Sequence, residues 1–290
     1  MSELDAGSRK FIEKYQVDIE RDWLQKFHEA KVSLEAPADH EYTANQILVF
    51  NGGEAMGRYI QTENKVKKIN CSGKGVFKVT PRGLEQYAAL DLMLDPNVQL
   101  VFSSGVAGSG KSLLACASAL EMVVGKPTGK YEQIILLRPV SYVGRSFGLV
   151  PGDADEKYLN FVGPVLALIN ELAPQKLEWM ISEGKIVAQP IEYIRGTTFK
   201  NSIVILDEAQ NTSVHEMKTI ITRMDSSSKL FVCGDTKQVD ERGDAKYKNG
   251  LTVAMDRMQS GRDSIVGSVE FFKSERGGIS ALATQRMDDK

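Results

Sequence analysis

Four short runs of apolar residues succeed one another in the second part of the chain. Each run is bounded by turn-forming or charged residues, and the runs cover residues 98–102, 134–137, 203–206 and 230–232. Runs of this length are typical of strands that are buried on both faces of a parallel sheet. A similar stretch at 268–272 predicts one more strand.

Stretches with a helical period of apolar residues separate these runs. They predict helices over residues 112–124, 155–172 and 214–224. An earlier helix is predicted over 84–94, and it ends near Asp95-Pro96 because proline cannot continue a helix. Strands that alternate with helices indicate an α/β fold, in which helices flank a parallel sheet.

The first 80 residues have a different pattern, which predicts a small α+β region. Apolar residues recur every four positions and predict one amphipathic helix over residues 8–30: Phe11, Tyr15, Ile19, Trp23 and Phe27. Such a helix either docks on the core or forms an oligomer contact. Residues 31–60 contain Pro37 and two adjacent glycines, and they predict loops and short strands.

Residues 65–82 are basic and contain no acid. Apolar residues alternate with the basic ones, which predicts a β-hairpin that turns at residues 72–75. The segment is either a solvated face or a surface that contacts a nucleic-acid backbone. Its basic side chains are Lys65, Lys67, Lys68, Lys74, Lys78 and Arg82.

Composition narrows these expectations further. The chain has 290 residues, which at roughly 150 residues per domain allows one large domain or one domain with an appendage. Its 36 basic and 38 acidic residues exclude a uniformly basic coat, although a local basic patch stays open. No apolar run reaches about 18 residues and the first ten residues are polar, so we expect a cytoplasmic protein without a membrane span. Cys71, Cys116 and Cys233 lack paired spacing, which predicts free thiols.

One glycine-rich segment carries specific chemistry. Residues 105–112 match the pattern GxxxxGK[ST] at every fixed position, after a predicted strand and at the start of a predicted helix. The glycines let backbone N–H groups point at phosphate oxygens, and the helix N-terminus adds partial positive charge. The lysine can reach the β- and γ-phosphates, and the hydroxyl after it can ligate Mg²⁺. We expect a nucleotide to contact Gly105, Val106, Ala107, Gly108, Ser109, Gly110, Lys111 and Ser112.

Two acids, Asp207 and Glu208, follow the apolar run at 203–206. Ligands of open α/β sheets bind at the carboxyl ends of the strands, where this pair is expected. We expect Asp207 to hold Mg²⁺ together with Ser112, and Glu208 to orient or deprotonate an attacking water. A transfer enzyme does not need the second acid, so the pair favours ATP hydrolysis over kinase chemistry.

A third element follows the run at 230–232. Gly234-Asp235 stand at the expected strand end, and Gln238 comes three residues after the aspartate. We expect the Gln238 amide to bond the γ-phosphate or the attacking water and to couple hydrolysis to movement. The alternative is an ordinary turn at the end of a strand.

In combination, these stretches resemble the PhoH family of ATPases, of the stand-alone type carried by bacteria and bacteriophages. The resemblance covers about residues 80–285 and includes further motifs in order: 137–140 (LRPV), 148–153 (GLVPGD), 193–198 (YIRGTT), 206–211 (LDEAQN) and 234–240 (GDTKQVD). The family is similar to the first motor domain of superfamily 1 helicases. It implies a P-loop NTPase with a RecA-like sheet, ATP hydrolysis with Mg²⁺ and a role in RNA metabolism, in a bacterial cell or a phage-infected host. The domains are then residues 1–80 and 81–290.

The resemblance also gives roles to single residues. Gln86 matches the upstream glutamine that reads adenine in related helicases, and an amide can satisfy both the amino group and a ring nitrogen of adenine. A solvated helix glutamine is the alternative. Arg138 and Arg195 are expected at strand ends near the nucleotide edge, and each either contacts phosphate or nucleic acid or forms a structural ion pair.

Helicases of this type bind ATP between two motor domains, and the second domain contributes an arginine worth roughly 10³–10⁵ in rate. Only residues 241–290 follow Asp240 here, which is too few for a second motor domain. We therefore expect a neighbouring subunit to supply the arginine in a closed head-to-tail ring, and the resemblance implies six subunits. The first candidate is Arg276, followed by Arg262 and Arg145.

The sequence leaves two functions of different classes. The first is an oligomeric ATPase that acts on RNA or single-stranded nucleic acid, with helicase activity as its extension. The second is an ATP-regulated binding module or scaffold with weak turnover. A binding module does not need Glu208, so this residue favours the ATPase.

Overall fold

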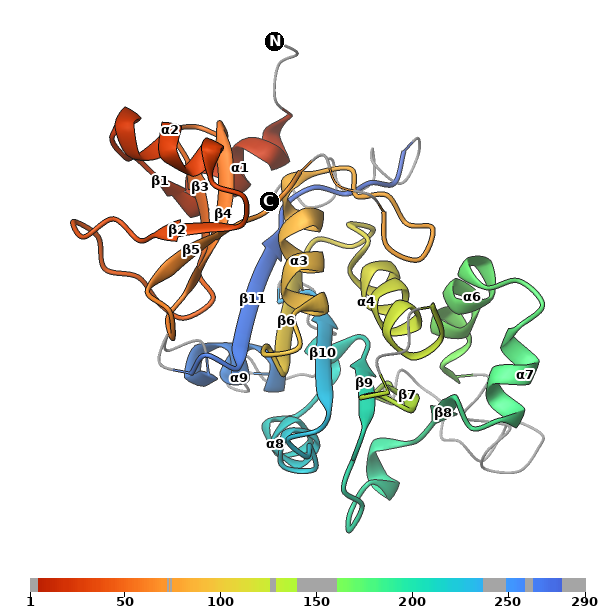
Figure 1. The fold of residues 1–290 in the computed structure, drawn as a ribbon. Coiled ribbons are helices and arrows are strands. Elements are labelled where there is room, and N and C mark those ends of the chain that lie inside the picture. The colour runs from red at the N-terminus through yellow and green to blue at the C-terminus, as the bar shows by residue number, and fades with distance from the viewer. Residues whose placement is uncertain are drawn as a thin grey trace, which may run out of the picture.

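The computed structural model describes residues 5–71, 73, 75–125, 129–139, 161–236, 249–258 and 263–277. These residues form two sheets, one of five strands near the N-terminus and one of six strands in the rest of the chain (Figure 1). The larger sheet forms the centre of the molecule, and the smaller sheet lies beside its outer strand.

All six strands of the larger sheet run parallel, in the order β11-β6-β10-β9-β7-β8. Every residue of three neighbouring strands is buried, as expected for strands that helices cover on both faces. The predicted apolar runs are all found as strands, whereas the short strand β8 was not predicted. The bounds are β6 (Leu100–Gly105), β7 (Gln133–Leu137), β8 (Ile186–Ala188), β9 (Ser202–Leu206), β10 (Lys229–Gly234) and β11 (Val266–Phe271).

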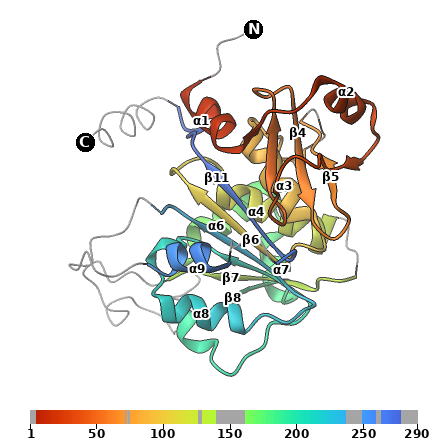
Figure 2. The ribbon, with the colours of Figure 1, turned by 90° about the vertical axis from the view of Figure 1, so that its left-hand side faces the viewer.

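Helices cover both faces of this sheet, which confirms the predicted α/β class (Figure 2). One face packs against α3 (Leu84–Leu94), α4 (Lys111–Leu120), α6 (Gly163–Leu172) and α7 (Leu177–Ser182). The other face packs against α8 (Val214–Thr222) and α9 (Gly250–Met258). The chain continues α4 as a π-helical turn, Glu121–Gly125. Of the helix predicted over 155–172, residues 155–160 lie outside the described part of the chain.

The prediction of one helix over residues 8–30 was wrong. The segment forms α1 (Ala6–Tyr15) and α2 (Arg21–Glu29), and between them β1 (Gln16–Val17) pairs in parallel with β3. The Asn51 side chain holds this break open, because it bonds both the N–H and the C=O of Ile19. The four-residue repeat continues across the break. Phe11 nevertheless belongs to the apolar cluster that includes the larger sheet, whereas Phe27 belongs to a separate cluster at the smaller sheet.

The predicted basic hairpin was also wrong. Strand β5 (Lys65–Lys68) pairs with β4 (Ala55–Ile60) and β2 (Ser33–Glu35), and β4 pairs on its other side with β3 (Ile47–Phe50). Residues 76–79 form only an isolated bridge. Lys67 lies 2.8 Å from the Asp91 carboxylate, and Lys68 donates to the carbonyls of His28 and Ala30. These lysines therefore serve contacts within the chain.

A buried charge cluster joins the two sheets. Arg58 of β4 is only 1% exposed, and its guanidinium bonds the Asp91 and Asp95 carboxylates of α3 and the side-chain oxygen of Asn45. The buried Lys229 of β10 donates to the carbonyls of Leu92 and Asp95 at the end of the same helix. The cluster therefore ties the smaller sheet, α3 and the larger sheet together.

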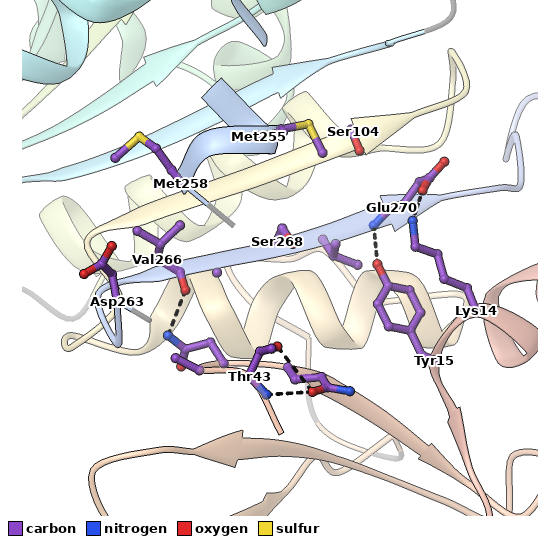
Figure 3. Close-up of a pocket in the computed structure, with 15 residues that line it drawn as sticks. Lys14, Tyr15, Thr43, Ser104, Met255, Met258, Asp263, Val266, Ser268 and Glu270 are labelled. Atoms are coloured by element: carbon purple, nitrogen blue, oxygen red, sulfur yellow. Dashed lines mark hydrogen bonds and ion pairs between the residues drawn. The ribbon is translucent and has the colours of Figure 1, made fainter. Parts of the chain in front are cut away.

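The helix α1 and the loop before β3 also supply side chains to the outer edge of β11 (Figure 3). The Tyr15 hydroxyl accepts the N–H of Glu270 at 3.0 Å, and Asn45 Nδ2 donates to the carbonyl of Val266 at 3.0 Å. Lys14 forms an ion pair with Glu270 beside them. These side chains occupy places that a neighbouring strand would take, and they line a hollow of about 270 Å³.

Two expectations about the whole chain can be compared with the described residues. The three cysteines are free, as predicted, with Cys116 and Cys233 buried. Among the helices described, none combines the length and the apolar character that crossing a bilayer would require.

Candidate functional site

A hollow of about 380 Å³ lies at the edge of the larger sheet where β6, β9 and β10 end. The residues predicted from three separate segments meet there, because parallel strands bring their carboxyl ends to one edge. Its lining includes Lys111, Ser112, Asp207, Glu208, Asp235 and Arg276.

The loop between β6 and α4 has the backbone that its glycines permit. Gly105, Gly108 and Gly110 have φ values of 128°, 73° and 92°, a region that residues with a Cβ rarely adopt. A Cβ on Gly105 would lie 2.0 Å from the carbonyl oxygen of Phe271. Val106 donates its N–H to that same oxygen, and Ser109 is buried. The loop is thus fixed against the end of β11.

The Lys111 ammonium folds back over this loop. Its Nζ donates to the carbonyls of Gly105 and Val106 at 2.7 Å each and lies 3.2 Å from the Ser109 hydroxyl. Burial lowers the pKa of Lys111, while carboxylates across the hollow act in the opposite direction. A buried cation that faces a hollow is suited to an anionic ligand such as phosphate.

The two predicted metal ligands lie in direct contact. Ser112 Oγ donates to Asp207 Oδ1 at 2.6 Å, across the space between α4 and the end of β9. Burial raises the pKa of Asp207, and the hydrogen bond from Ser112 opposes this rise. A desolvated carboxylate next to a hydroxyl is a set of oxygen donors that suits a small hard cation such as Mg²⁺.

Glu208 follows with a strained backbone. Its φ of 52° and ψ of 41° are left-handed, an unusual conformation for a residue with a Cβ. Gln210 Nε2 donates to one carboxylate oxygen at 2.6 Å, and Arg138 Nη2 lies 3.7 Å from the other. Of the alternatives for Arg138, the structure shows the ion pair. Sequence reasoning gave Gln210 no role, although it stands within the 206–211 motif.

Gln86 supports the phosphate loop. The side chain is buried; its Oε1 accepts the N–H of Arg82 at 2.9 Å, and its Nε2 donates to the carbonyl of Ser109 at 3.0 Å. The described lining of the hollow does not include it. Its contact with adenine stays a prediction.

Arg276 lies over the loop of its own chain. It belongs to the strap, a name used here for residues 272–277, which follows β11. Within the strap, the N–H of Glu275 donates to the carbonyl of Gly108 at 2.9 Å. A Cβ on Gly108 would lie 2.7 Å from Arg276 Cδ. The expectation was an arginine presented to a neighbouring subunit, whereas here the residue contacts its own site.

Three further predicted residues lie outside the described part of the chain: Gln238, Arg262 and Arg145. Arg195 is described, and its guanidinium lies 3.4 Å from the ring of His215 in the first turn of α8. The expected roles of these residues stay predictions.

A parallel sheet with helices on both faces, a glycine-rich loop between its strand β6 and helix α4, and a carboxylate facing that loop define the P-loop NTPase fold. Within this class the chain belongs to the PhoH family. The sequence profile of the family described as PhoH-like protein matches residues 78–281.

Individual relatives agree with this assignment. Protein PhoH2 of Bacillus subtilis is 31% identical over 263 residues, which are 87% of this chain and 59% of that protein. Protein PhoH of Escherichia coli K12 is 36% identical over 181 residues, or 61% of this chain and 49% of that one. The chain thus spans about half to three fifths of the length of these relatives.

Two solved structures show a remote likeness to the chain. The HK97 bacteriophage large terminase has a TM-score of 0.41 and 15% identity, covering 69% of this chain and 41% of that one. The Pif1 helicase from Candida albicans has a TM-score of 0.35 and 16% identity, covering 71% and 43%.

Proposed function

We propose that this chain binds ATP with Mg²⁺ at the phosphate loop and hydrolyses it. The observation that carries the proposal is the contact of Ser112 with Asp207, 2.6 Å long, beside the Lys111 ammonium. A hydroxyl, a carboxylate and a cation converge in one hollow, and this is the set that a nucleoside triphosphate and its metal require.

The charges of the site support this proposal. Both Asp207 and Lys111 are buried, and burial disfavours the charged form of each. Bound Mg²⁺ would supply positive charge at Asp207 and at the phosphate oxygens. On ATP binding, the Lys111 ammonium exchanges the carbonyls of Gly105 and Val106 for the β- and γ-phosphates.

Glu208 is proposed to orient the attacking water and to accept its proton. Gln210 and Arg138 hold its carboxylate, and the side chain retains 42% of its exposure, so a water can reach it. Arg276 is proposed to contact the phosphates of an ATP bound to the same chain, because it lies over Gly108. Gln238 keeps its proposed role as the γ-phosphate sensor.

The test is Glu208→Gln, which keeps the shape of the side chain and removes its basicity. We expect ATP affinity to stay near that of the parent chain and turnover to fall at least about 100-fold, a usual range for losing a general base. The matched control is Glu178→Gln on the exposed face of α7. Phosphate release and binding of a fluorescent ATP analogue are measured for each, and undiminished turnover of the first variant would refute the assignment. A scaffold with weak turnover would show little release even in the parent.

We further propose that hydrolysis is coupled to RNA or single-stranded nucleic acid. Membership of the PhoH family supports this, and the lysines of β5 are no longer the favoured surface because they bond within the chain. A better surface lies beside α8, on the segment that follows β8. Tyr193 is 63% exposed there, and the exposed Arg195 stands close by. Such an aromatic ring and guanidinium suit base stacking and phosphate contact.

Tyr193→Ala combined with Arg195→Ala tests this surface. We expect affinity for single-stranded RNA to fall about tenfold or more, since one stacked base is worth roughly 1–3 kcal/mol. Trp179→Ala, at another exposed aromatic residue on α7, serves as the control. Fluorescence anisotropy at one fixed salt concentration measures both, because phosphate contacts depend on salt. Equal affinity of all three proteins would exclude this surface.

Assembly into a head-to-tail ring, with six subunits as the expected number, stays a prediction. Because Arg276 is proposed to serve its own site, an arginine acting between subunits would come from elsewhere in the chain.

A further inference from the structure

Gln210 stands between two of the strand ends that form the site. It lies in the short turn Ala209–Asn211 after β9 and is 5% exposed. Its Nε2 donates to Glu208 Oε2 at 2.6 Å, while its Oε1 accepts the N–H of Asp235 at 3.0 Å. Since a backbone N–H can only donate and an ionised carboxylate can only accept, the orientation of this amide is determined by its partners.

The backbone at the end of β10 packs closely against the amide. A Cβ on Gly234 would lie 2.8 Å from Gln210 Oε1 and 2.7 Å from Leu251 Cδ2. The glycine at the end of β10 therefore makes room for the amide. Asp235, which follows it, is itself only 6% exposed.

Glu208 needs such a support. Its side chain keeps 42% of its exposure, so burial alone does not fix the carboxylate. The Arg138 guanidinium is 3.7 Å away, which is too long for a direct hydrogen bond. The contact from Gln210 is the close and directional one.

We propose that Gln210 is a positioning residue that holds the Glu208 carboxylate at a fixed place relative to the end of β10. A displacement of Asp235 moves the amide, and the amide moves the carboxylate, so the position of Asp235 affects the attacking water through one side chain. This inference depends on the role in ATP hydrolysis proposed for Glu208.

Gln210→Glu distinguishes the two hydrogen bonds of the amide, one to Glu208 and one from Asp235. The new carboxylate still accepts the N–H of Asp235, but when ionised it repels the Glu208 carboxylate instead of donating to it. We expect kcat for ATP to fall roughly 10- to 100-fold, which corresponds to one hydrogen bond to a charged group, with KM and nucleotide affinity within about twofold of the parent. The matched control is Gln25→Glu on α2, where another glutamine amide donates to a glutamate carboxylate, that of Glu29, at 3.2 Å on the surface.

A double variant distinguishes positioning from a merely structural role. In Glu208→Gln with Gln210→Glu, the amide and the carboxylate have exchanged places, so the hydrogen bond can form again. We expect its unfolding midpoint to return towards that of the parent chain. Its turnover should equal that of Glu208→Gln alone, because a residue that acts only through Glu208 adds no loss once Glu208 is gone.

The outcomes are distinct. Turnover of Gln210→Glu equal to that of Gln25→Glu would overturn the inference and leave the proposed hydrolysis intact. So would a double variant whose losses multiply, since that result indicates general damage to the site. An inactive parent chain would overturn the proposed hydrolysis and this inference with it.

Discussion

At the scale of single residues, the site combines groups that are proposed to meet a nucleotide and its metal with groups that hold them in place. The pairs Lys111 with Ser112 and Asp207 with Glu208 follow from residue type and spacing, because phosphate and metal chemistry need those groups at the ends of strands. Gln210 escaped prediction because an amide acquires its role only from partners that the fold brings within reach. The left-handed backbone of Glu208 is equally a product of its surroundings.

Glu85 of α3 is a buried acid whose contribution to the stability of the fold depends on pH. Its carboxylate accepts the N–H of Phe272 in the strap, and burial raises its pKa from 4.5 to about 7. A raised pKa means that the folded chain holds the proton more tightly than the unfolded chain. Stability from this group is therefore complete below about pH 4.5 and is lost as the pH rises through about 7.

Glu85→Gln keeps the acceptor for Phe272 but carries no charge. We expect its free energy of unfolding to exceed that of the parent at about pH 8, by on the order of 2 kcal/mol, and to equal it near pH 4.5. Urea unfolding at both pH values measures this difference. The control is Glu63→Gln in an exposed turn. A difference that does not change with pH would show that desolvation of Glu85 is not the cause.

At the scale of elements, patterns of apolar residues predicted the strands of the larger sheet but misjudged the first helices. The apolar repeat from Phe11 to Phe27 has one period, but its residues pack in two places, since α1 and α2 belong to different apolar clusters. No local pattern distinguishes these cases. The position of the strap could likewise not be predicted from a local pattern, because its contact with Gly108 joins segments more than 160 residues apart.

The contact of the strap with Gly108 predicts that Arg276 acts in the ATP site of its own chain. Arg276→Ala and Glu208→Gln are each expected to lose most turnover, and mixing the two proteins should recover none, because every site keeps one of the two defects. An arginine that served a neighbour would instead leave some mixed sites with both groups intact. Phosphate release after mixing at equal concentrations distinguishes these cases, and unmixed samples are the controls.

At the scale of the whole molecule, the buried charge cluster makes the smaller sheet an integral part of the fold. Arg58 connects β4 to the carboxylates of Asp91 in α3 and Asp95 at its end, and Lys67 of β5 lies 2.8 Å from the first of them. This pairing could not be predicted from the amino-acid pattern, because the arginine and its partners are 33 and 37 positions apart.

Arg58→Met tests the cluster. We expect it to lower the free energy of unfolding by about 3–5 kcal/mol, because it breaks a buried ion pair and leaves the carboxylates of Asp91 and Asp95 to the partly exposed Lys67. Arg21→Met, which breaks the exposed pair with Glu54, should cost less than about 1 kcal/mol. Urea unfolding of both variants measures the contrast, and similar losses would contradict a joining role for Arg58.

The side chains on the outer edge of β11 have one more consequence, for solubility. An outermost strand offers N–H and C=O groups with which a strand of another molecule can pair, and this is a common route to aggregation. Tyr15 and Asn45 occupy two of these groups, yet both precede residue 78, where the match to the family begins. A protein cut at that boundary would keep β11 and lose its cover. Protection against edge-to-edge aggregation therefore resides in a part of the chain outside the family match.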